Sequence, residues 1–481
     1  MNRTLLSVAI LSVGSGGFRG AGAQLTLREA LNTADHSAYG NRVAAAIAGA
    51  QSAAALVPLK GILPSVRFEA GYIRTTDPIG VFGTTLRQRT ITQANFDPQR
   101  LNYPTAVGNY QSGVVVEQPI FNGDAWMRRR AAVRIADASR AAEEWTRLST
   151  RVDVVQAYYG AVLASDRVRT LLAAARAAGA HLRQAQAMVR QGLVTKSDAL
   201  LASVRASDID AQLAEAQGAL DTARRQLAIL LGRDGRQSTQ LLELPTTLPS
   251  GDRIRDVIAG DIGSIEAMPR ADVRAASRGL DAARADVLRA RSAYLPRLNS
   301  FARYDWNSNN RPYAGDRNWT VGILASWNIF SGASDLGEER ASAARAAAAQ
   351  AQEEAARANA SLDVEQSRTA LDVALTRLSI AECTTVQSAE AHRIVGRKYE
   401  GGLATVVELL DAQATELQSA LALSQVRWGA IVAAANRLRA LGLDPAALTA
   451  FDDTNAIAAE GPAHLSASGT DGMRTDCSRT P

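Results

Sequence analysis

At residues 118–123 the chain reads Gln118-Pro119-Ile120-Phe121-Asn122-Gly123, and residues 327–332 repeat the pattern as Trp327-Asn328-Ile329-Phe330-Ser331-Gly332. Both stretches lie close to the start of a long segment without proline, since none occurs between Pro119 and Pro245 or between Pro312 and Pro445. Proline breaks helices, and these segments are rich in the helix formers Ala, Leu, Arg, Gln and Glu. We expect long helices over 124–190 and 334–399, each roughly 100 Å in length at 1.5 Å per residue.

The two stretches belong to an internal repeat. Two further landmarks recur roughly 210 residues later in the same order: Gly192-Leu193-Val194-Thr195 as Gly402-Leu403-Ala404-Thr405, and Leu231-Gly232-Arg233-Asp234 as Leu441-Gly442-Leu443-Asp444. Upstream, the offset is longer because the first copy carries an insert at 76–107. The sequence therefore predicts a tandem duplication, with a first repeat at 24–270 and a second at 271–445.

Each repeat has the same expected order of elements. A helix is followed by a strand, a loop, a second strand, the long helix, a tight turn, and a returning helix at 195–231 or 405–441, and the segment 235–270 links the copies. In the returning helices, apolar or small residues recur at alternating spacings of four and three, which predicts coiled-coil seams. The seam positions are Ala202, Ala206, Ile209, Leu213, Ala216, Leu220, Ala223, Leu227 and Leu230, then Leu410, Ala414, Leu417, Leu421, Ser424, Trp428, Ile431, Ala435 and Leu438.

Strands are expected at about 63–74, 109–119, 297–306 and 318–328, because apolar and polar residues alternate there. Phe68 and Tyr72 fall on one side and Arg67 and Glu69 on the other. Outer-membrane strands and a half-buried soluble sheet give the same alternation. Four strands cannot close a membrane barrel, so a membrane location requires several chains to share one, and three would supply about twelve strands.

The first 23 residues have the order of a signal peptide, with a basic start, an apolar run and small residues ending Ala21-Gly22-Ala23. Downstream we find no apolar run of about 18 residues, so no transmembrane helix is expected. Residues 446–481 are rich in Gly, Ser, Thr, Asp and Ala and are expected to form a partly disordered tail. The fold class expected from all of these features is mainly α with β.

Charge and motif content argue against several classes of function. The formal charge is +5, but basic and acidic residues are interspersed along the helices, which indicates solvated surfaces rather than a nucleic-acid site. The four histidines are scattered without metal-ligand spacing, and no phosphate-binding glycine loop or nucleophile elbow is present. We expect no enzyme activity, no cofactor and no metal site.

Together these landmarks resemble those of a known family, the TolC-like outer-membrane channel-tunnel proteins of Gram-negative bacteria. The resemblance runs from about Leu25 to Pro445, and rests on the duplication, the two strand-to-helix elbows and the two turn motifs at matching positions. It implies a homotrimer with a shared β-barrel in the outer membrane and an α-helical tunnel in the periplasm. It also implies an exit duct that passively conducts substrates from an inner-membrane pump and a periplasmic adaptor to the cell exterior.

The resemblance also implies roles for individual residues. The tunnel of this family narrows at its periplasmic tip, and the positions that match its constriction are Tyr399, Glu408, Asp411, Ser197 and Asp198. Tyr399 would pair with Asp198, while three copies of Glu408 and Asp411 would form acidic rings that raise one another's pKa values. The turns that would dock the adaptor contain Gly192, Leu193, Val194, Thr195, Gly402, Leu403, Ala404 and Thr405.

One position departs from the pattern of the family. Its best-known member has an arginine where this chain has Ala404, so one closing interaction should be missing or be replaced by Lys196. The alternative function, from another class, is a periplasmic coiled-coil structural or adaptor protein without a pore. An adaptor would normally have one hairpin flanked by small β-domains, whereas this sequence contains two complete copies.

Overall fold

The computed structural model describes residues 24–192, 194–233, 243–262 and 268–451. The chain forms two compact units. The sheet unit consists of Arg42–Thr146 and Pro269–Asp363, and the tip unit of Met1–Asn41, Arg147–Met268 and Val364–Pro481. Each unit takes segments from both sequence repeats, so the expected repeats at 24–270 and 271–445 are not separate compact bodies. The expected signal peptide lies outside the described residues.

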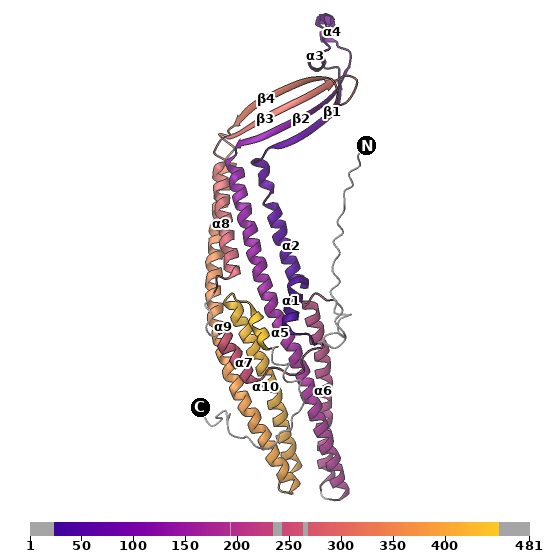
Figure 1. The fold of residues 1–481 in the computed structure, drawn as a ribbon, viewed down its shortest axis with the longest axis vertical. Coiled ribbons are helices and arrows are strands. Elements are labelled where there is room, and N and C mark those ends of the chain that lie inside the picture. The colour runs from indigo at the N-terminus through magenta and orange to yellow at the C-terminus, as the bar shows by residue number, and fades with distance from the viewer. Residues whose placement is uncertain (1–23, 193, 234–242, 263–267, 452–481) are drawn as a thin grey trace, which may run out of the picture. The chain divides into compact units, whose positions relative to one another are not determined.

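The sheet unit contains four antiparallel strands in the order β1-β2-β3-β4 (Figure 1). Their bounds are Ser65–Thr75, Val107–Phe121, Arg297–Ser308 and Asp316–Ser326. β2 extends two residues beyond each end of the expected range, and β4 begins and ends two residues earlier than expected. The pairing of β2 with β3 shifts register between Pro119 and Phe121, where a proline cannot donate to the ladder.

The insert between β1 and β2 is a small helical cap. It contains α3 (Pro78–Arg87), the 3₁₀ helix η2 (Gln93–Phe96) and α4 (Pro98–Asn102), and the two α-helices start with an aspartate N-cap followed by proline. The cap is attached to the sheet by buried amides: Nε2 of Gln88 donates to Oδ1 of Asn109 at 2.9 Å, and Nδ2 of Asn109 donates to Oδ1 of Asn307 at 2.8 Å.

Helices make up most of the remaining structure. The long helices are α5 (Gly123–Arg190) and α9 (Ser334–Glu400), and the returning helices are α6 (Lys196–Leu230) and α10 (Val406–Ala440). All four lie within one residue of the expected bounds at each end. The other helices are α1 (Leu27–Ser37), α2 (Tyr39–Ala54), η1 (Val57–Gly61), α7 (Gly251–Val257), the π-helical turn η3 (Ile258–Ile262), α8 (Ala271–Ser292) and η4 (Pro445–Phe451).

The predicted seams of α6 and α10 face inward. All of their positions are buried or half-buried, and in α6 the fully covered residues Ala202, Ile209 and Ala216 follow one another at heptad spacing. The small seam residues allow close approach: Oγ of Ser424 in α10 donates to Oδ2 of Asp166 in α5 at 2.5 Å.

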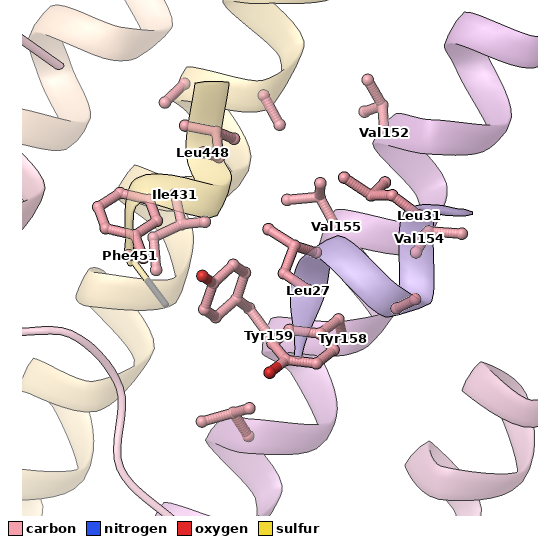
Figure 2. Close-up of a cluster of buried hydrophobic side chains, with 14 of the residues drawn as sticks. Leu27, Leu31, Val152, Val154, Val155, Tyr158, Tyr159, Ile431, Leu448 and Phe451 are labelled. Carbon is pink, nitrogen blue, oxygen red and sulfur yellow. The ribbon is translucent and has the colours of Figure 1, made fainter. Parts of the chain in front are cut away.

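The core of the tip unit gathers side chains that are far apart in sequence (Figure 2). Leu27 of α1, Tyr158 of α5 and Ile431 of α10 are at most 1% exposed. Leu448 and Phe451 of η4 also lie in this core, at 0% and 3% exposure. The expectation of a disordered tail from residue 446 is therefore wrong for residues 446–451, because two apolar side chains anchor that segment. Residues 452–481 lie outside the described part.

The stretch Leu27–Gly61 contains an 18-residue window with a mean hydropathy of 1.4, which by length and composition alone is enough to cross a membrane. No such window was expected from the sequence. The helix is interrupted at Ala38, between α1 and α2, and its apolar character comes largely from the alanines of α2. α1 itself is a core helix, because Leu27, Ala30, Leu31 and Ala34 are buried in the tip-unit core, whereas only 17% of the apolar window is buried.

Arg151 joins three elements of the tip unit, and we expect its replacement by alanine to destabilise the protein. Its guanidinium donates to Asp35 at 2.7 and 3.0 Å and is paired with Asp444 after α10, while the Arg151 and Asp35 side chains are only 16% and 19% exposed. Truncation leaves a largely buried carboxylate unpaired, which typically costs about 2–3 kcal/mol.

The loss of unfolding free energy is measured by urea unfolding, monitored by circular dichroism. Arg345→Ala is the control, because the Arg345 side chain is 63% exposed and reaches Glu338 only at 3.5 Å. The control should change the unfolding free energy by less than about 0.5 kcal/mol. Equal effects of the two replacements would contradict the structural role of Arg151.

Candidate functional site

Two helical hairpins end at equivalent turns on the same end of the tip unit (Figure 1). The α5–α6 turn contains Gly192 with φ of +73°, and the α9–α10 turn contains Gly402 with φ of +69°. Their amides donate to the carbonyls of Val189 and Tyr399, both at 3.0 Å. This left-handed conformation strains residues with a side chain, so glycine at the same position of both repeats fixes the same reversal twice.

The residue after each turn begins a capping box. The Thr195 backbone N–H and hydroxyl donate to Oδ2 of Asp198 at 3.0 and 2.8 Å, and the amide of Asp198 donates back to the Thr195 hydroxyl at 3.2 Å. Thr405 and Glu408 repeat the arrangement at 2.7, 3.0 and 3.2 Å. These caps were not predicted from the sequence, although their signal, threonine followed three residues later by an acid, is readable in both repeats.

Capping changes the expected electrostatics of Glu408. Hydrogen bonds from the backbone and side chain of Thr405 lower the pKa of Glu408, and the charge of Lys398 lowers it further. The sequence analysis expected like-charge repulsion to raise this pKa in an assembled ring. Within one chain the direction is the opposite, so Glu408 is a stably ionised carboxylate at neutral pH.

Tyr399 does not form the expected pair with Asp198. Its hydroxyl donates to Sδ of Met188 at 3.5 Å, across the two hairpins. Burial raises the pKa of Tyr399, and the negative charge of Asp198 raises it further. The two side chains therefore interact electrostatically without a hydrogen bond between them. In this structure Oδ2 of Asp198 instead caps α6.

The remaining tip residues are mainly at the surface. Ser197 and Asp411 are exposed, and Asp411 lies three residues after Glu408 on the solvent side of α10. Leu403 is 82% exposed, while Val194 and Ala404 are half-buried; Leu193 lies outside the described residues. Lys196, which the sequence offers as a replacement for the arginine missing at Ala404, is exposed.

The sheet has two chemically different faces. The pairing register places Val66, Phe68 and Tyr72 of β1 on the same face as Trp319, Val321 and Ile323 of β4, and these six side chains are 53–74% exposed. Aromatic pairs cover the middle strands, with ring centroids 4.6 Å apart for Tyr72 and Tyr110 and 4.9 Å apart for Tyr304 and Trp306. This face is an exposed apolar surface that spans all four strands.

The opposite face is charged. Arg67 and Glu69 of β1, Glu117 of β2, and Arg303 and Asp305 of β3 share it. The polar side of β1 was predicted from the sequence, whereas the other three residues were not. They lie at odd-numbered offsets from the apolar residues Val114 and Tyr304, so the same alternation would have placed them on the opposite face. In the described part of the chain β1 and β4 each pair on one side only, so both edges of the sheet remain open.

The profile of the outer membrane efflux protein family matches residues 42–233 and 267–442. The chain belongs to this family. It is 30% identical over 268 residues to the alkaline protease secretion protein AprF of Pseudomonas aeruginosa, which covers 52% of each protein, so the chain spans about half the length of this curated relative.

Solved structures show the same fold. The outer-membrane channel CmeC of Campylobacter jejuni has a TM-score of 0.73 and 16% identity, covering 92% of this chain and 94% of that one. The outer membrane protein VceC of Vibrio cholerae has a TM-score of 0.72 and 19% identity, covering 87% and 96%.

These matches confirm the expected resemblance and the expected fold class of long helices with a small sheet. The family match also assigns the chain to the outer membrane, as an efflux protein rather than an enzyme. The apolar sheet face is therefore the surface expected to contact lipid, and the helical tip unit belongs to the periplasmic part.

Proposed function

We propose that this chain is one subunit of a homotrimeric exit duct that serves a tripartite efflux or type I secretion system. Three four-stranded sheets would close one barrel of about twelve strands, and the helices would form the periplasmic tunnel. The duct would conduct substrates passively from an inner-membrane transporter and a periplasmic adaptor to the outside of the cell.

The observation that carries this proposal is a sheet with an exposed apolar face and two open edges. Backbone groups at an open edge cannot face hydrocarbon unpaired, because each unsatisfied group costs several kcal/mol in order of magnitude. Pairing β1 of one chain with β4 of the next removes every edge at once and leaves the charged face toward the lumen. A pore-free periplasmic adaptor, the alternative function, would leave this apolar face without a role.

The tip is the proposed gate and docking site. Glu408 and Asp411 would face the pore mouth as two acidic rings, with Asp198, Ser197 and Tyr399 on the neighbouring helices. The exposed Leu403 and the two glycine turns would contact the adaptor. The match to a protease secretion protein favours polypeptide cargo, whereas the family description favours efflux, so both transporter classes remain within the proposal.

Fractionation and bilayer recordings test the assembly. The protein should be recovered from outer-membrane vesicles as a species that migrates as a trimer unless boiled, and the purified trimer should form discrete channels in planar bilayers. Recovery as a monomer in the soluble periplasm, or a trimer without conductance, would reject the exit-duct function. Purification of the cross-linked assembly from cells would identify the adaptor and the transporter.

A further inference from the structure

The charged face of the sheet carries one connected chain of ion pairs. Arg67 is paired with Glu117, its Nε lies 3.9 Å from Glu69, and Nη1 of Arg303 lies 3.8 Å from the other oxygen of Glu69. Nε of Arg303 donates to both carboxylate oxygens of Asp305 at 2.8 Å. We call these five residues, Arg67, Glu69, Glu117, Arg303 and Asp305, the charged belt.

The pairing register arranges the belt in rows across three strands. Glu69, Gly113 and Asp305 lie opposite one another, and the next row on this face is Arg67, Val115 and Arg303. An acidic row is thus followed by a basic row. The lack of a side chain at Gly113 leaves room above β2 for the charged side chains of β1 and β3, because a Cβ at this position would overlap Oδ1 of Asp305.

Four of the five side chains of the belt are accessible. Those of Arg67, Glu69 and Glu117 are about half exposed, at 53%, 50% and 46%, and Arg303 is 35% exposed, whereas Asp305 is only 14% exposed. Exposed ion pairs contribute little to stability, so packing alone does not account for five charges on one face. Beside the belt a hollow of about 290 Å³ is lined by residues that include Glu69, Gly71, Gln111 and Arg303.

The belt has an excess of negative charge. It contains three carboxylates and two guanidinium groups, hence a net charge of −1 per chain. The remaining charged residues of this face are neutralised elsewhere: Arg297 by Asp124 at 2.9 Å, and Asp316 by Arg89 at 3.8 Å. Fixed charges that line a pore attract ions of opposite sign and repel ions of like sign.

We propose that the charged belt is an ion-selective ring in the exit barrel and is separate from the acidic tip. The belt favours cations and cationic groups of the cargo over anions. This inference rests on the proposed channel function. Three chains would place three acidic and three basic rows around one lumen, with a net charge of −3 summed over the belt. Removing the acids should favour anions, and removing the arginines should favour cations.

Reversal potentials in planar bilayers under a KCl gradient test the belt. The parent protein is Glu408→Gln/Asp411→Asn, so that the tip no longer contributes its acidic charges. In this parent, Glu69→Gln/Glu117→Gln should lower the cation-to-anion permeability ratio at least about twofold, and Arg67→Gln/Arg303→Gln should raise it by a similar factor. Arg74→Gln is the matched control, because Arg74 lies on the same strand but on the opposite face, and it should leave the ratio unchanged.

The outcomes separate the belt from the channel function. Opposite shifts with an inert control support the belt. A conducting parent whose ratio is unmoved by both variants, or moved as much by Arg74→Gln, overturns the belt and leaves the channel standing. A parent that assembles but never conducts overturns the proposed channel. If Arg67→Gln/Arg303→Gln fails to migrate as a trimer on gels, the test rests on Glu69→Gln/Glu117→Gln alone. The belt then requires the cation-to-anion permeability ratio of that variant to fall.

Discussion

Replacing Ile323 by arginine is expected to remove most of the assembled protein from the outer membrane. Ile323 lies near the middle of β4, opposite Ser300 of β3, and is 69% exposed on the apolar face. In a barrel that side chain would face hydrocarbon, where an arginine costs about 2–4 kcal/mol at mid-depth. The cost recurs in each of three subunits, so we expect at least a tenfold loss of trimer, measured by immunoblotting unboiled outer-membrane fractions.

Leu324→Arg is the matched control for this prediction. Leu324 is the next residue of the same strand, lies opposite Asn299 on the charged face, and is 59% exposed. An arginine there would enter the aqueous lumen, so trimer levels should stay close to those of the unmodified protein. Equal loss from the two positions would show that arginine disrupts the strand itself, and normal assembly of Ile323→Arg would show that this face does not contact lipid.

Sequence reasoning located the strands because side-chain alternation is a local property. The ends of β2 and the bulge at Pro119–Phe121 were not predictable in the same way, since they depend on which residues of β3 are opposite. The helical insert could have been predicted, because Asp77-Pro78 and Asp97-Pro98 are helix-start signals. The ordered segment 446–451 could not have been predicted, because burial of Leu448 and Phe451 depends on α1 and α5, hundreds of residues away.

The tip shows the same division between local and distant information. The glycine turns are visible in the repeats, and the caps at Thr195 and Thr405 follow from spacing alone. The contact of Tyr399 with Met188 was not predictable, because it depends on how the two hairpins are rotated about their axes. The charged belt is an intermediate case: residue alternation gives its face, but the register that joins Glu69 to Arg303 across β2 is tertiary information.

Removing the acidic charges of the tip should have the largest effect on conduction. We expect Glu408→Gln/Asp411→Asn to weaken block by a trivalent cation at least about tenfold, because three chains would lose six carboxylates from one pore mouth. Glutamine is chosen over alanine because its side-chain oxygen can still accept from Thr405 and keep the cap of α10. Block is measured from single-channel currents in planar bilayers as the cation is added on the periplasmic side.

Two comparisons isolate charge as the cause. Thr405→Ala removes the hydroxyl that bonds Glu408 but keeps the backbone N–H donor and the charge of Glu408, so block should persist although the first turn of α10 is weakened by about 1 kcal/mol. The pKa of Glu408 is lowered from its ordinary value of 4.5, so the cap contribution is present above that value and is lost only as the pH falls through the lowered pKa. In the unmodified protein, the contribution of Glu408 to block should therefore stay nearly constant from pH 7 down to about pH 5. Unchanged conductance and unchanged block in the double variant would place Glu408 and Asp411 away from the pore, and the constriction would then have to be sought elsewhere along the helices.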